Sequence, residues 1–143
     1  MQATSDKDIA KLNDFLKNEV AAVETYGQCL EKSKKFPDLE RLLELRQSHA
    51  ERARLLRERI VALGGEPAEG SGVWGGFAKL VEGGAKAFGE QAALSALEEG
   101  EDKGLKDYRT EIEQLSDSTR QFVASMLLPE QQRSHDTMSR MTR

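Results

Sequence analysis

The chain has 143 residues, enough for one domain with one hydrophobic core, and its 21 basic and 25 acidic residues give a net charge of −4. That balance gives no electrostatic reason to expect a nucleic acid as partner. The single cysteine excludes an internal disulfide framework, and no apolar stretch approaches the ~20 residues that span a bilayer. We therefore expect a soluble, cytoplasmic protein without a signal peptide.

The first half of the chain predicts two helices. Residues 6–33 carry apolar side chains at steps of three and four, with Ser5 in the position of an N-cap. Pro37 suits the first position of a second helix over residues 37–63, which a pair of glycines ends. Its inward face is expected to consist of apolar residues and one histidine, namely Leu42, Leu45, His49, Ala53, Leu56 and Ile60.

The second half predicts two more helices, over about 90–116 and 119–141. The inward face of the third is expected to consist of Leu94, Leu97, Glu101, Leu105, Tyr108, Ile112 and Leu115, and that of the fourth of Phe122, Leu128, His135 and Met138. Pro129 lies inside the fourth pattern and predicts a kink or a restart there. Because runs with the period of a strand are absent, the fold class is all-α.

A long connection, residues 64–89, separates the second and third helices. A helix of ~25 residues is ~38 Å long, a distance that ~12 extended residues can cross. The connection can therefore run the length of a bundle and leave these two helices parallel. One such crossover is the connectivity of ferritin-like four-helix bundles, so we expect residues 1–143 to form a single domain of that kind.

Two similar segments of the sequence place polar residues on the inward faces of the predicted helices. EVAAVETY runs from Glu19 to Tyr26, and EDKGLKDY runs from Glu101 to Tyr108. In both, a glutamate precedes a tyrosine by seven residues, which puts the two on one face of a helix. Each following helix carries a histidine, at the end of RQSH and of QRSH: His49 and His135. Charged groups on apolar faces are costly unless they are paired or bind a metal.

Two segments, LNDFLKNEVAAVETY and RQSHAERARLLRERIVALGGEP, resemble the first helix pair of bacterioferritin and rubrerythrin-type di-iron proteins. Through GGEPAEGSGVWGGFAKL and ALEEGEDKGLKDY, nearly the whole chain is similar to a family of uncharacterised bacterial ferritin-like proteins, a domain of unknown function. The resemblance implies a ferritin-like bundle and no established activity. The metal-ligand positions that it implies are Glu19, His49, Glu101 and His135. Tyr26 and Tyr108 are candidate hydrogen-bonding partners of these ligands or electron donors, or else core tyrosines with satisfied hydroxyls.

Two positions depart from the di-iron pattern. Arg46 and Gln132 each lie three residues before a histidine, where the resemblance implies the metal-bridging glutamates. An arginine has no acceptor and keeps its charge in proteins, so Arg46 is expected to replace the metal. We then expect a buried polar network of Glu19, Arg46, His49, Glu101, Gln132 and His135 that fixes the helix register.

Two alternatives involve a metal. If Arg46 swings outward, two carboxylates and two imidazoles remain to hold one zinc, iron or manganese ion. A working di-iron oxidase or peroxidase is the other. The substitutions favour a protein without a cofactor or enzymatic activity, which works as a structural or interaction protein. The resemblance to ferritin-like proteins implies that it pairs as a homodimer, and the alternative is a protein partner.

Overall fold

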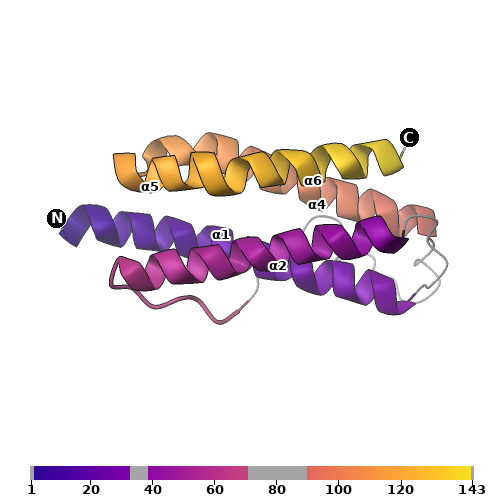
Figure 1. Cartoon of the computed structure of the whole chain (residues 1–143), viewed down its shortest axis with the longest axis horizontal. Coiled ribbons are helices and arrows are strands. Elements are labelled where there is room, and N and C mark those ends of the chain that lie inside the picture. Colours follow the sequence, from indigo (N-terminus) through magenta and orange to yellow (C-terminus); the bar gives the residue numbers. More distant parts are fainter. Residues whose placement is uncertain (1, 33–38, 71–89, 143) are drawn as a thin grey trace.

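The described residues of the computed structural model are 2–32, 39–70 and 90–142, and they fold into long helices without a strand (Figure 1). The helices are α1 (Gln2–Lys32), α2 (Leu39–Ala62), α4 (Glu90–Glu111) and a fourth composed of α5 (Asp117–Phe122), the π-helical turn η3 (Val123–Leu127) and α6 (Leu128–Met141), with the short 3-10 turn η2 (Ile112–Gln114) after α4. This arrangement confirms the predicted all-α fold with four helices.

The helices form two antiparallel hairpins, α1–α2 and α4–α6, and α2 runs in the same direction as α4 (Figure 1). After α2 the chain turns at Gly64, whose φ of 87° favours glycine. The following residues lie along α1, where Asn13 Nδ2 donates to the carbonyl of Glu66 at 3.1 Å and the amide of Ala68 donates to Asn13 Oδ1 at 2.7 Å. The predicted crossover begins here, but residues 71–89 of it lie outside the described residues, so the ferritin-like connection stays a prediction.

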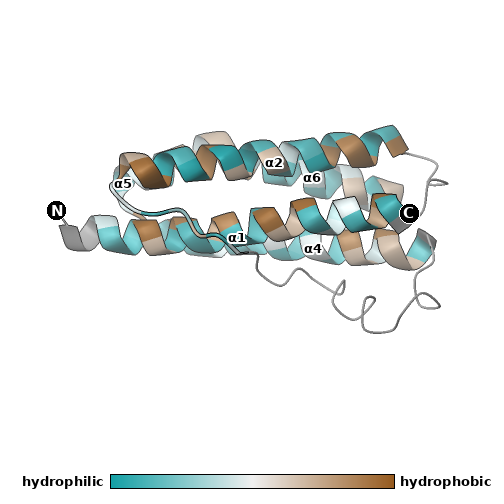
Figure 2. Cartoon of the chain, turned by 90° about the horizontal axis from the view of Figure 1, so that it is seen from below, coloured by the Kyte–Doolittle hydropathy of each residue, from teal (hydrophilic) through white to brown (hydrophobic). Residues whose placement is uncertain are grey.

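Hydrophobic and hydrophilic segments alternate along each helix (Figure 2), and the buried apolar residues form two clusters inside the bundle. One cluster lies at the end where α2 and α4 begin, and it consists of Ala21, Ala22, Tyr26, Cys29, Leu30, Leu42, Leu45, Ala93, Leu94, Ala96, Leu97 and Met138. The other, toward the opposite end, consists of Leu12, Phe15, Leu16, Ala53, Leu56, Ile60, Tyr108, Leu115, Val123 and Leu127. A middle layer therefore remains between the two clusters.

The fourth helix contains the irregularity that the proline predicted. A π-helical turn occupies Val123–Leu127, and Pro129 falls in the first turn of α6 just after it. Proline lacks an amide hydrogen and clashes with the preceding turn, and a π turn is one way in which a helix accommodates that local misfit. Asp8 on α1 holds the start of α5, because its carboxylate accepts hydrogen bonds from the amide of Ser116 at 3.1 Å and the hydroxyl of Thr119 at 2.7 Å.

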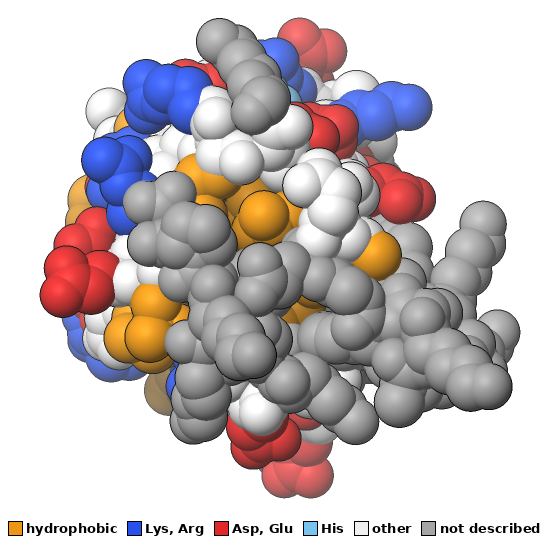
Figure 3. Space-filling model, turned by 90° about the vertical axis from the view of Figure 1, so that its right-hand side faces the viewer, with side chains coloured by type: hydrophobic (Ala, Val, Ile, Leu, Met, Phe, Trp, Pro, Cys, Tyr) orange, Lys and Arg blue, Asp and Glu red, His pale blue; other side chains and the backbone are white. Residues whose placement is uncertain are grey.

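The surface is mixed in charge. Figure 3 looks onto the end of the bundle where α2 and α4 begin, and on the described part of this face both basic and acidic side chains lie near hydrophobic ones. None of the described helices is both long and apolar enough to cross a membrane.

Candidate functional site

A layer of buried polar side chains crosses the middle of the bundle. All four long helices contribute, and the side chains are Glu19 and Tyr26 from α1, His49 and Arg52 from α2, Glu101 and Tyr108 from α4, and Gln131 and Ser134 from α6. Because each of these residues is at most 3 % exposed, water contributes little to solvating the charges. Their mutual contacts therefore decide whether the layer is stable.

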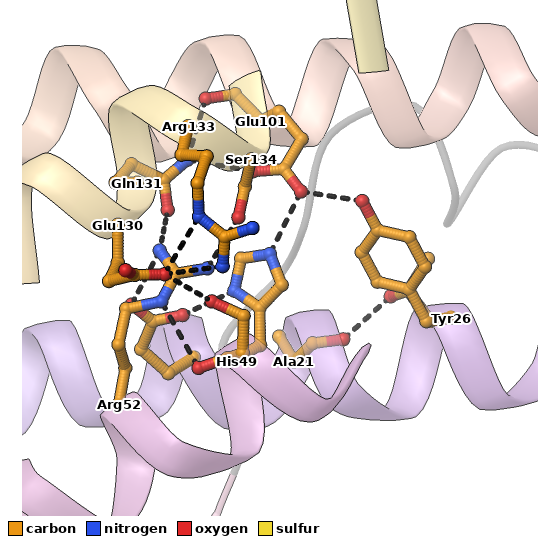
Figure 4. Close-up of polar contacts among 12 residues, drawn as sticks. Ala21, Tyr26, His49, Arg52, Glu101, Glu130, Gln131, Arg133 and Ser134 are labelled. Atoms are coloured by element: carbon orange, nitrogen blue, oxygen red, sulfur yellow. Dashed lines mark hydrogen bonds and ion pairs between the residues drawn. The ribbon is translucent and has the colours of Figure 1, made fainter. Parts of the chain in front are cut away.

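His49 bridges the two carboxylates of the layer. Its Nδ1 lies 2.5 Å from Glu19 Oε1, and its Nε2 lies 2.8 Å from Glu101 Oε2 (Figure 4). An ionised carboxylate only accepts hydrogen bonds, so both ring nitrogens have to donate. The geometry therefore fits a doubly protonated, positively charged imidazole between two carboxylates.

Each of the two buried tyrosines forms its hydrogen bond across the bundle, between α1 and α4. Tyr26 donates its hydroxyl to Glu101 Oε2 at 2.5 Å, while Tyr108 donates to Glu19 Oε2 at 2.5 Å. Each tyrosine thus bonds the glutamate of the other helix, not the glutamate that precedes it by seven residues. Hydroxyl donors at this distance stabilise buried carboxylates.

Arg52 joins α2 to α6. Its guanidinium donates to Gln131 Oε1 at 2.5 Å and to Ser134 Oγ at 2.9 Å, and it forms an ion pair with Glu19 at 3.5 Å. The amide of Gln131 in turn donates to the backbone carbonyl of Glu101 at 3.0 Å and to its carboxylate at 2.9 Å (Figure 4). This reach is possible because Gly104 leaves room: a Cβ there would lie 2.9 Å from the amide nitrogen.

The charges in the layer balance. Burial opposes ionisation of Glu19 and Glu101, but the positive charges of Arg52 and His49 outweigh it and lower the pKa of both carboxyls. Burial and Arg52 both disfavour a charged His49, yet the two carboxylates raise its pKa. The two positive and two negative charges of the layer therefore neutralise one another.

The structure brings together some of the predicted site residues and leaves others outside. Glu19, His49 and Glu101 meet in the layer together with both tyrosines. The prediction that Arg46, Gln132 and His135 belong to the buried network is wrong. Arg46 is exposed and lies over Gly27, Gln132 bonds to Arg109 and Asp136 on the surface, and His135 is a quarter exposed and pairs with Asp102 and Asp136.

The physical reason is helical register. On α2 the inward stripe consists of the buried residues Leu42, Leu45, His49, Arg52, Ala53, Leu56 and Ile60. Arg46 and Arg52 lie on opposite edges of this stripe, each rotated by ~60° from His49.

On the fourth helix the equivalent seam is Leu127, Gln131, Ser134 and Met138. Gln132 and His135 each directly follow a seam residue, so they are rotated by ~100° away from the seam. The similarity between RQSH and QRSH therefore aligns His49 with His135, although these two positions are not structurally equivalent. The residue of the fourth helix that corresponds to His49 is Gln131. On the fourth helix the seam spacing is a sequence signal for Gln131 and Ser134. On α2 the spacing does not distinguish Arg52 from Arg46, and the bonds of Arg52 to α6 do so in the folded bundle.

Residues 7–114 match the family model described as "Domain of unknown function (DUF2383)". The chain belongs to this family. The matched range includes the network residues from Glu19 to Tyr108, whereas α6 with Gln131 and Ser134 lies beyond it. Neither the curated proteins nor the solved structures gave a match.

Two hollows reach the layer in this DUF2383 member. A groove of about 750 Å³ between α2 and α6 has Arg52 and Ser48 among its lining residues, with Leu55, Met126 and Pro129 beside them. A cavity of about 10 Å³ lies between α1 and α4 against Glu19 and His49, and that is about the size of one water molecule. Among the described residues no group of three or more His, Cys, Asp or Glu side chains is arranged to hold a metal ion.

Proposed function

We propose that this chain is a non-catalytic helical bundle of the ferritin-like type that works as a structural or interaction protein. In it, buried cations take the place that two metal ions take in di-iron bundles. One observation carries the proposal: His49 uses both ring nitrogens to bind the carboxylates of Glu19 and Glu101. Those glutamates stand on the first and third helices, as the single glutamates of di-iron bundles do.

The other two helices of a di-iron bundle supply Glu-x-x-His, two ligands at a spacing of three residues. The inward pairs at that spacing here are His49 with Arg52, and Gln131 with Ser134. Neither pair contains a carboxylate, and the guanidinium of Arg52 has no lone pair for a metal. The guanidinium of Arg52 and a protonated His49 together supply the positive charge that the two buried glutamates require.

A mononuclear metal site is the second candidate, because Glu19, His49 and Glu101 meet in one layer. As they stand these side chains bind one another and are not arranged around a metal ion, so a metal would require them to turn toward it. Two carboxylates and an imidazole are suitable ligands for zinc, iron or manganese. For this, the imidazole has to release a proton so that a ring nitrogen has a lone pair.

The test is the metal content of the untagged protein, measured by plasma mass spectrometry after incubation with iron(II), zinc or manganese and removal of free metal. The wild type is expected to retain no stoichiometric metal. A matched variant with His49→Glu, Arg52→His, Gln131→Glu and Ser134→His restores the full ligand set and is expected to take up iron.

Three results decide between the candidates. Uptake by the rebuilt variant alone supports the proposal. One ion per wild-type chain that disappears with Glu19→Gln would overturn it in favour of the mononuclear site. A folded but metal-free rebuilt variant would show that the layer does not correspond to a di-iron centre.

A further inference from the structure

The groove between α2 and the fourth helix is a surface that the buried layer does not use. Its volume is about 750 Å³, and its lining comes from residues 44–55 of α2 and residues 125–133 of the fourth helix. The bonds of Arg52 to α6 join the two helices along it. One turn beyond the lining, the guanidinium of Arg59 stacks at 4.6 Å on the ring of Phe122 and joins the helices again. The groove is therefore a preformed feature of the bundle surface.

One end of the groove is apolar. The half-buried Leu55 of α2 lies there, with Met126 and Pro129 from the fourth helix. Met126 is 47 % exposed, and it belongs to the π-helical turn. Such turns are frequent at functional sites, and a methionine adapts its flexible side chain to the shape of an apolar partner. This end is therefore suited to receive an apolar side chain.

The other charged side chains that line the groove carry an excess of negative charge. They are three glutamates and two arginines, namely Glu44, Glu51, Glu130, Arg54 and Arg133. Arg54 donates to Glu51 at 3.0 Å, and Arg133 donates to Glu130 at 2.7 Å (Figure 4). Among the described residues Glu44 has no hydrogen-bond or ion-pair partner. One exposed carboxylate of the lining is therefore left without a counter-charge.

Arg52 lines the groove as well, but its charge is balanced inside the layer. It is buried and pairs with Glu19 at 3.5 Å. Together with His49 it offsets the two buried carboxylates, whose pKa it lowers. The unbalanced charge of the groove is therefore negative.

This charge favours one kind of occupant. An acidic partner would place like charge beside Glu44. A second copy that packs groove on groove would do the same, because a two-fold contact sets the same patch against itself. The occupant that complements the groove is apolar at the Met126 end and positively charged at the Glu44 end.

We propose that this groove binds an amphipathic helix of a partner protein, with an apolar side chain against Leu55 and Met126 and a lysine or arginine against Glu44. The two contacts are about eleven residues apart on α2, which is ~16 Å along the helix. A docked helix spans that length with two residues about eleven positions apart, and these lie on one face because eleven residues make about three turns. A helix that lies in a groove on such anchors is a common mode of recognition.

The inference rests on the proposed role as an interaction protein and gives that role a surface and a kind of partner. It does not depend on the replacement of metal, because Glu44, Leu55 and Met126 lie outside the polar layer. The metal content of the protein and its binding of a helix are therefore separate results.

The experiment measures binding of synthetic helical peptides to the full chain by fluorescence anisotropy. The probe is an alanine-based peptide of about 18 residues with two leucines and, about eleven positions further on the same face, two lysines. One control peptide has glutamates in place of the lysines, and another has the lysines on the opposite face. The probe is expected to bind at least about tenfold more tightly than either control. Added salt is expected to weaken its binding, because salt screens the charge pair with Glu44.

Matched variants locate the contact. Met126→Ala is expected to weaken binding of the probe about tenfold, whereas Leu43→Ala, equally exposed at 47 % but outside the groove, should leave it unchanged. Glu44→Gln should weaken binding about threefold and reduce its dependence on salt. Glu24→Gln on α1 changes the net charge by the same amount and should have no effect. All four side chains are exposed, so these substitutions leave the core intact.

Several results would overturn the proposal. They are equal binding of the probe and a control peptide, no binding of the probe, and equal effects of the variants inside and outside the groove. Sedimentation of the chain alone tests the remaining occupant. Self-association that is lost in Met126→Ala would assign the groove to a second copy and overturn the proposal as well.

Discussion

Replacement of Gly104 by alanine is expected to destabilise the bundle, although alanine favours a helix over glycine by ~1 kcal/mol. The added Cβ would lie 2.9 Å from Nε2 of Gln131, whose amide is buried and bonded to Glu101 and Arg52. Displacing that amide leaves buried donors and acceptors without partners, at ~1–3 kcal/mol each. Two such losses against the helical gain give a net destabilisation of about 3 kcal/mol, within a range of about 1–5.

Gly27→Ala on α1 is the matched control, because its Cβ would lie 3.2 Å from the end of the exposed Arg46 side chain, which can move into solvent. We expect it to stabilise the protein by up to ~1 kcal/mol. Urea unfolding followed by far-ultraviolet circular dichroism measures both changes, provided that the m-value stays constant. The reasoning about the Gln131 contact is refuted if Gly104→Ala is as stable as the wild type, or more stable.

Three further outcomes are expected from the same unfolding assay. Arg52→Met should lower the free energy of unfolding by about 3–5 kcal/mol, because it removes one partner of a buried ion pair, and adding Glu19→Gln should restore a large part of that loss. Equal losses in the single and the double variant would contradict the pairing of Arg52 with Glu19. Asp8→Ala should cost about 2 kcal/mol through the lost charged hydrogen bonds to the start of α5; a neutral effect would show that these bonds contribute nothing. Because the folded-state pKa of His49 is raised, its contribution is fully present below the unfolded pKa of ~6.5 and is lost as the pH rises through the folded value; His49→Gln should abolish that alkaline slope, and a slope that persists would assign it to another group.

The all-α fold was predictable because several features of the sequence indicate the same helices. The apolar spacing located the long helices, and Pro129 marked the place where the fourth one becomes irregular. The glutamate-to-tyrosine spacing placed Glu19 and Glu101 correctly on inward faces, because a glutamate within an apolar stripe has to meet a partner inside the bundle.

The partners of those glutamates were harder to predict. A histidine leaves two candidate neighbours on its helix face, three residues before and three after, and the resemblance to di-iron proteins favoured the earlier one, Arg46. The two arginines lie on opposite edges of the inward stripe, so helix periodicity does not choose between them, and the placement of α6 against α2 brings Arg52 to Gln131 and Ser134. The exchange of tyrosines between the halves depends on how α1 and α4 are placed against each other, and periodicity within a helix carries no information about that.

The exchange of hydroxyl groups between α1 and α4 has a consequence for the order of folding. Tyr26 and Glu101 are 75 residues apart in the chain, and Glu19 and Tyr108 are 89 apart. Contacts of such long sequence separation require the largest loops to close, whereas each helical hairpin can form from local contacts. The hairpins should therefore be structured in the transition state before the bonds between them form, and substitutions of Tyr26 and Tyr108 should have low φ-values. Such substitutions would then shorten the lifetime of the folded protein and leave its folding rate nearly unchanged.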